Sequence, residues 1–106
     1  MSFLKRRTEI ITTKQRAYLR GVANGINAIL QIGKEGVTDA LVANIAEALE
    51  AREIVKVAVL ETSPVSAKEA IADVMEKIPG TEAVQVIGRR FTVYKRNLKE
   101  PKIILP

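Results

Sequence analysis

Helix-type and strand-type hydrophobic patterns alternate along this sequence, and the alternation limits the folds that are open to it. Apolar residues recur at helical spacing over residues 13–24, 38–53 and 66–78. Short runs rich in β-branched residues occupy residues 28–32, 54–60, 83–87 and 91–95. The order α-β-α-β-α-β-β predicts a compact α/β fold, a two-layer sandwich with a mixed sheet.

Local signals mark where these elements begin and end. Thr38 is placed to cap the second helix, and Ser66 and Glu69 have the spacing of a capping box for the third. The pair Pro79-Gly80 ends the third helix. Gly88-Arg89-Arg90 is a short connection between two strands, which predicts a hairpin.

The length predicts one domain, because 106 residues are enough for a single hydrophobic core. Residues 1–11 are interpreted as a flexible basic arm, and residues 12–106 as the domain. The stretch Ile103-Ile104-Leu105-Pro106 either adds an edge strand or trails from the domain.

Composition excludes most catalytic chemistry. The chain has no Cys and no His, which removes the common zinc sites, thiol catalysis and imidazole bases. It has no phosphate-binding loop of the GxxxxGK[ST] type. Glu47, Glu50 and Glu53 are expected on the outward side of the second helix, where acidic groups are usually only solvated. We therefore expect no enzyme, no cofactor and no metal.

No apolar run is long enough to span a membrane, and residues 1–7 lack the apolar segment of a secretory signal. The expected location is the cytoplasm.

Charge is distributed unevenly along the chain. Residues 1–34 carry seven basic side chains against one acid, and residues 89–106 carry six against one. Residues 35–88 carry four basic side chains against ten acids. If folding brings the two basic ends together, the molecule has a positive face that suits a polyanion.

The loop Gly33-Lys34-Glu35-Gly36 is a candidate phosphate-binding element. Its glycines permit positive φ angles and close approach of a ligand, and it leads into a helix N-terminus that favours anions. The GXXG loop of KH domains clamps a nucleic-acid backbone in a similar way. The alternative is a plain turn between a strand and a helix.

Basic residues at both ends of the chain are the second candidate. Arg16 and Arg20 share one helix face, and Tyr94 lies among basic neighbours where it can stack on a base. The alternative is ordinary solubilising charge, with Tyr94 as a sheet residue. The candidate RNA-binding residues outside the loop are Lys14, Arg16, Arg20, Arg89, Arg90, Tyr94, Lys95 and Arg96.

The order and spacing of several blocks resemble a known family. The blocks are Thr13-Lys14-Gln15 with Leu19 and Arg20, residues 31–38, residues 48–50, residues 53–57, residues 84–88, residues 93–96 and residues 103–106. They resemble the CRM domain (chloroplast RNA splicing and ribosome maturation) in its stand-alone, YhbY-like form. The resemblance implies a fold similar to the C-terminal domain of translation initiation factor three. It also implies RNA binding at the GxxG loop and nearby basic residues, and association with precursors of the large ribosomal subunit.

The leading hypothesis is a monomeric RNA-binding protein that acts in assembly of the large ribosomal subunit. The first alternative is a protein-interaction module that docks an acidic partner or self-associates through a sheet edge near residues 103–105. The second alternative, a small-molecule enzyme, requires an apolar pocket with a buried carboxylate.

Overall fold

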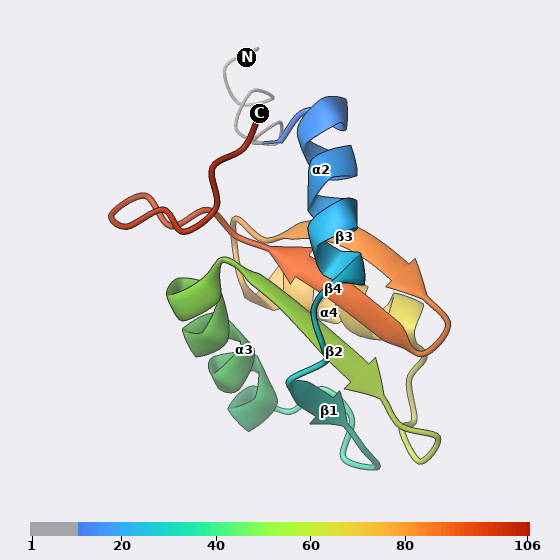
Figure 1. Ribbon diagram of the computed structural model, residues 1–106. Coiled ribbons are helices and arrows are strands. Elements are labelled where there is room, and N and C mark those ends of the chain that lie inside the picture. Colours follow the sequence, from blue (N-terminus) through green and yellow to red (C-terminus); the bar gives the residue numbers. More distant parts are fainter. Residues whose placement is uncertain (1–10) are drawn as a thin grey trace, which may run out of the picture.

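The computed structural model describes residues 11–106 and contains a four-stranded mixed sheet in the order β1-β2-β4-β3 (Figure 1). Strands β1 and β2 are parallel, and β4 is antiparallel to both of its neighbours. The elements are α2 (Thr13–Asn24), β1 (Leu30–Ile32), α3 (Asp39–Arg52), β2 (Ile54–Val59), α4 (Ala67–Lys77), β3 (Glu82–Ile87) and β4 (Arg90–Tyr94). The predicted order and the α/β class are confirmed.

The helices begin where side chains can satisfy free backbone N–H groups. Thr12 caps α2 and Ser66 caps α4, and each forms a capping box with the residue three positions on, Gln15 or Glu69. Thr38 caps α3 through its hydroxyl, which accepts from the backbone N–H of Leu41 at 3.1 Å. These caps fix the entry of every helix that the described chain contains.

Both faces of the sheet are covered. Helices α3 and α4 pack on one face against the alternate residues Val55, Val57 and Val59 of β2 and against Phe91 and Val93 of β4. On the opposite face, α2 lies across β3 and β4 (Figure 1).

The core on the α2 side is the smaller of the two. Ile54 and Tyr94 point to it from the sheet, and Leu19 and Ala23 point to it from α2. The prediction of two layers therefore needs one correction, because α2 adds a third layer over part of the sheet. None of the helices in the described chain is long and apolar enough to cross a membrane.

Two predicted boundaries also change. Ile11, assigned to the arm, is buried in the core beneath α2, so the folded domain begins before residue 12. Residues 1–10 of that arm lie outside the described residues. Residues 103–105 form no strand. Ile103 and Leu105 instead pack against the α2-side core, so the sheet edge proposed for self-association at these residues is absent.

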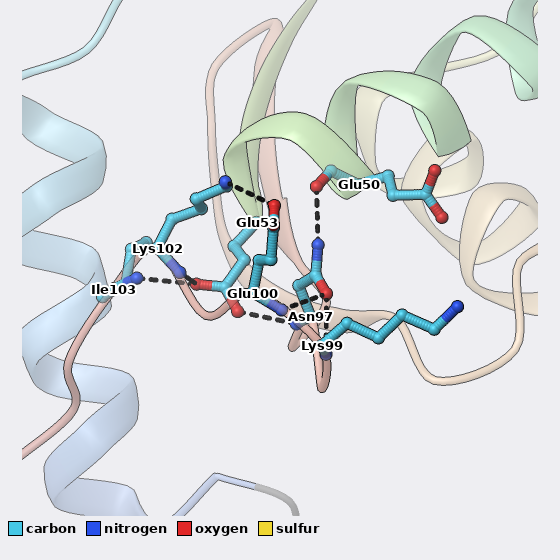
Figure 2. Close-up of polar contacts among 7 residues, drawn as sticks. All are labelled: Glu50, Glu53, Asn97, Lys99, Glu100, Lys102 and Ile103. Atoms are coloured by element: carbon cyan, nitrogen blue, oxygen red, sulfur yellow. Dashed lines mark hydrogen bonds and ion pairs between the residues drawn. The ribbon is translucent and has the colours of Figure 1, made fainter.

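A buried carboxylate holds the C-terminal segment in place (Figure 2). Glu53, expected on an outward helix face, is fully buried just after α3, with φ at +67°. Its carboxylate accepts the backbone N–H groups of Asn97 at 2.6 Å and of Lys102 and Ile103 at 2.7 Å each. The Asn97 side chain adds a bond of 2.8 Å to the carbonyl of Glu50. These contacts hold the C-terminal segment beside the end of α3, and Ile103 and Leu105 pack against the α2-side core.

Candidate nucleic-acid interface

Three connections meet at one end of the sheet, where β1 and β2 end and β4 begins (Figure 1). They are the loop Gly33–Gly36, the β2–α4 connection over residues 60–66, and the β3–β4 turn. Backbone hydrogen bonds tie them together, from Leu60 N–H to the Ile32 carbonyl at 2.9 Å and from Val59 N–H to the Arg89 carbonyl at 2.6 Å. We call this region the loop end of the sheet.

The Gly33–Gly36 loop is a tight turn that leans on the β2–α4 connection. Gly36 N–H donates to the Gly33 carbonyl at 3.0 Å, and Lys34 and Glu35 are exposed at the tip. Gly36 is buried with φ at +73°, and a Cβ there would lie 3.3 Å from Cγ of Pro64. The second glycine is therefore required by backbone conformation and packing, while the tip remains free to meet a ligand.

A row of four residues crosses the α2-side face of the sheet beside this loop. The strand register places Gln31, Ala58, Arg90 and Ile87 next to one another. This row lies beyond the end of α2. Asn24, at the end of that helix, accepts a hydrogen bond from Gln85, which precedes Ile87 by two residues in β3. Gln31, Arg90 and Ile87 are exposed. We call these four residues the open row.

The charges at the loop end are mostly basic on the α2 side. Lys56 lies beside the open row, on the same face as Arg90, and the row contains no acid. Glu35 and Glu61 are the acids at the loop end, and many of the other acidic side chains lie on α3 and α4, on the opposite face. Lys56 and Gln31 join the candidate site, and neither was predicted from the sequence. Period-two alternation along β2 places Lys56 on the face opposite the buried Val55 and Val57.

The structure brings together only part of the predicted basic set. Arg89 and Arg90 lie at the loop end with Lys34, and Arg89 forms a long, exposed ion pair of 3.9 Å with Glu61. Arg20 is exposed on α2. The remaining predicted basic residues lie toward the opposite end of the sheet; they are Lys14, Arg16, Lys95 and Arg96.

Arg16 is committed to the fold. It forms an ion pair of 3.4 Å with Glu82 and donates a hydrogen bond to the carbonyl of Ala83, which ties α2 to β3. The guanidinium that the sequence suggested for phosphate binding is therefore engaged in contacts within the fold.

Tyr94 corrects a second site prediction. Its side chain is fully buried between the sheet and α2, and no residue of the described chain forms a hydrogen bond with its hydroxyl. Burial raises the pKa of Tyr94 above its usual value of 10; the negative charge of Glu53 acts in the same direction, whereas Arg96 opposes the shift. Tyr94 cannot stack on a base, because α2 and residues 103–105 cover the face of the sheet on which it lies.

The fold and the loop end define a class: a small α/β domain with a GxxG loop between a strand and a capped helix. The family model for the CRS1 / YhbY (CRM) domain matches residues 11–95. The chain belongs to this family, as the resemblance in its sequence blocks predicted.

Curated relatives share nearly the whole length of the chain. The probable RNA-binding protein YqeI of Bacillus subtilis is 39% identical over 97 residues, covering 92% of this chain and 100% of the relative. An RNA-binding protein of Haemophilus influenzae is 31% identical over 96 residues, covering 91% of this chain and 95% of the relative. These relatives and the family confirm the prediction that the chain is not an enzyme.

A solved structure shares the fold. The solution structure of a hypothetical protein from Staphylococcus aureus superposes with a TM-score of 0.72 at 36% identity. The match covers 92% of this chain and 100% of the other.

Proposed function

We propose that this protein binds RNA at the loop end of the sheet. The observation that carries the proposal is the acid-free open row with Arg90, flanked by Lys56 and by Lys34 at the tip of the GxxG loop. Arg90, Lys56 and Lys34 supply cations for a phosphate backbone on this side, although Glu35 and Glu61 also lie at the loop end, and most other acids lie on α3 and α4. The relatives from Bacillus subtilis and Haemophilus influenzae are named as RNA-binding proteins, which supports the same conclusion.

We further propose that the RNA is a large-subunit ribosomal precursor and that the protein acts in the cytoplasm. The support is the resemblance to stand-alone CRM domains, together with the missing membrane span in the described chain. Phosphate contacts provide affinity that depends on salt but carry no sequence code. Selection of this RNA therefore depends on its shape or on unpaired bases.

Affinity for large-subunit ribosomal RNA across a salt series tests the proposal. The double variant Lys34→Glu, Arg90→Glu reverses two charges at the loop end. The matched control, Lys77→Glu with Lys99→Glu, makes the same change in net charge far from the loop, at the end of α4 and in the C-terminal segment. The first variant should bind at least tenfold more weakly, and its salt slope should fall by about 0.7 to 0.9 per lost phosphate contact.

The control variant should lose much less affinity and keep the parent's salt slope. Equal losses in both variants would mean that net charge alone governs binding. That result would refute a site at the loop end.

A further inference from the structure

A groove runs around the end of β2, next to the GxxG loop. Its larger part, about 310 Å³, lies between the β2–α4 connection and the β3–β4 turn. A second hollow of about 270 Å³ continues onto the α2 side of the sheet, toward Ala58 and Arg90. The two hollows share Val59, Leu60, Glu61 and Arg89, so they form one path from the open row to the start of α4.

The larger hollow has an apolar wall and a polar mouth. Leu60, Pro64 and Val65 line it, and Leu60 is 41% exposed. The polar groups of the wall bond to one another, since the Ser63 hydroxyl donates to the Val65 carbonyl at 2.8 Å and accepts its N–H at 3.1 Å. At the mouth, Arg89 and Glu61 face each other with side chains 59% and 86% exposed. A ligand there meets an apolar surface, one charged donor and one charged acceptor.

The apolar wall of this hollow is also the support of the GxxG loop. A Cβ at Gly36 would lie 3.3 Å from Pro64, and a Cβ at Gly33 would lie 3.9 Å from Leu60. Leu60 and Pro64 therefore separate the loop from the hollow by the thickness of one side chain. A phosphate on the loop and a group in the hollow can belong to the same short stretch of one strand.

We propose that this hollow, the base cleft, binds one unpaired nucleobase of the RNA strand whose phosphates contact the GxxG loop and Arg90. The inference rests on the proposed function and names its ligand as single-stranded. The base lies with its face on Leu60 and Pro64, and its edge pairs with Arg89 as donor and Glu61 as acceptor. A volume near the lower limit of ligand pockets fits a single base.

The buried position of Tyr94 strengthens the argument for this cleft. Phe91 is buried as well, so neither aromatic residue of β4 offers a stacking surface. Single-stranded RNA is read through bases that leave the stack and contact protein. At the loop end, the apolar wall beside Arg89 is a surface that can receive such a base.

Three RNA probes test the cleft: a short oligoadenylate, a ribose-phosphate strand of equal length without bases, and a blunt duplex. The parent is compared with Leu60→Ala, which shortens the wall but keeps the backbone bond to Ile32. The matched control is Leu98→Ala, because Leu98 is 83% exposed in the C-terminal segment, away from the groove. The parent and control should bind oligoadenylate about fivefold more tightly than the baseless strand. This is the low end of the range for a base stacked on an aromatic side chain, and it is chosen because the wall is aliphatic.

Leu60→Ala should lose that preference and bind oligoadenylate as weakly as the baseless strand. The readout is the ratio of the two affinities within each variant, because Leu60 also lies against the GxxG loop and its truncation weakens phosphate binding equally for all three probes. Equal binding of oligoadenylate and the baseless strand by the parent would overturn the base cleft and leave phosphate binding at the loop intact. Failure of the parent to bind any of the three probes would refute the proposed function, and the base cleft with it.

Discussion

Replacing Glu53 by glutamine removes a buried charge while keeping the size of the side chain. In the parent, one carboxylate oxygen accepts from Lys102 and Ile103, and the other accepts from Asn97 (Figure 2). A glutamine carbonyl can still accept two N–H groups, but its amide group then faces the Asn97 N–H, and both are donors. One bond is lost and the other two become neutral.

The magnitude follows from these three bonds. A bond to a charged acceptor contributes about 1.5–3 kcal/mol and a neutral one about 0.5–1.5 kcal/mol. Glutamine loses one of these hydrogen bonds and weakens the other two, but it also avoids the cost of burying a charge. The lost hydrogen bonding is the larger effect, so we expect a loss of about 3 kcal/mol in the free energy of unfolding. For a domain of this size the melting temperature should fall by roughly 12 °C.

Two assays measure the effect: urea denaturation reports global stability, and trypsin cleavage after Lys99 and Lys102 reports release of the segment. The matched control is Glu50→Gln, because only the backbone carbonyl of Glu50 takes part in the network, and its side chain points away from it (Figure 2). The reasoning would be refuted if Glu53→Gln matched Glu50→Gln in both denaturation midpoint and cleavage rate.

Three further predictions concern backbone strain, ionisation and association. Gly36→Ala should lower the free energy of unfolding by about 1–2 kcal/mol, because the φ angle of Gly36 is +73° and Pro64 is close. The control Gly21→Ala, within α2, should raise it by about 0.5–1 kcal/mol. Urea denaturation measures both changes. Burial raises the pKa of Tyr94, so the unfolded chain ionises first and the parent should lose stability as pH rises above about 10. Tyr94→Phe should show a flatter pH profile in the same assay and unchanged RNA affinity; a profile identical to the parent's would contradict the assignment. Nuclease-treated protein should sediment as a monomer of 11.6 kDa, and a stable dimer would instead favour the protein-interaction hypothesis.

The fold was largely predictable because its signals are local. A helix cap or a hairpin turn depends on residues that are neighbours in the sequence, as at Thr38, at Ser66 and at residues 88–90. The structure has helices that begin after these two caps and a hairpin at this turn. The burial of Tyr94 was not predictable in the same way. It follows from α2 and residues 103–105 covering the second face of the sheet, and no local pattern reports that contact.

The candidate site was only partly predictable for a related reason. The GxxG loop is a contiguous motif, so the sequence alone located it. Lys56 and Gln31 join Arg90 through strand register, and the base cleft joins residues 60–66 to the β3–β4 turn. The prediction that Glu53 faces solvent was wrong, although an acidic residue at the end of a helix normally does so. The N–H groups that its carboxylate binds come from more than 40 positions later in the chain, so no local pattern indicates them.

The anchoring of residues 97–105 also bears on where the C-terminal limit of this domain should be drawn. The family match ends at residue 95, before Asn97, Lys102 and Ile103. A fragment cut at that boundary would keep the Glu53 carboxylate without its three donors and would uncover Tyr94. When this domain is recombined with other domains, the unit to transfer therefore extends beyond the family match, to at least residue 105.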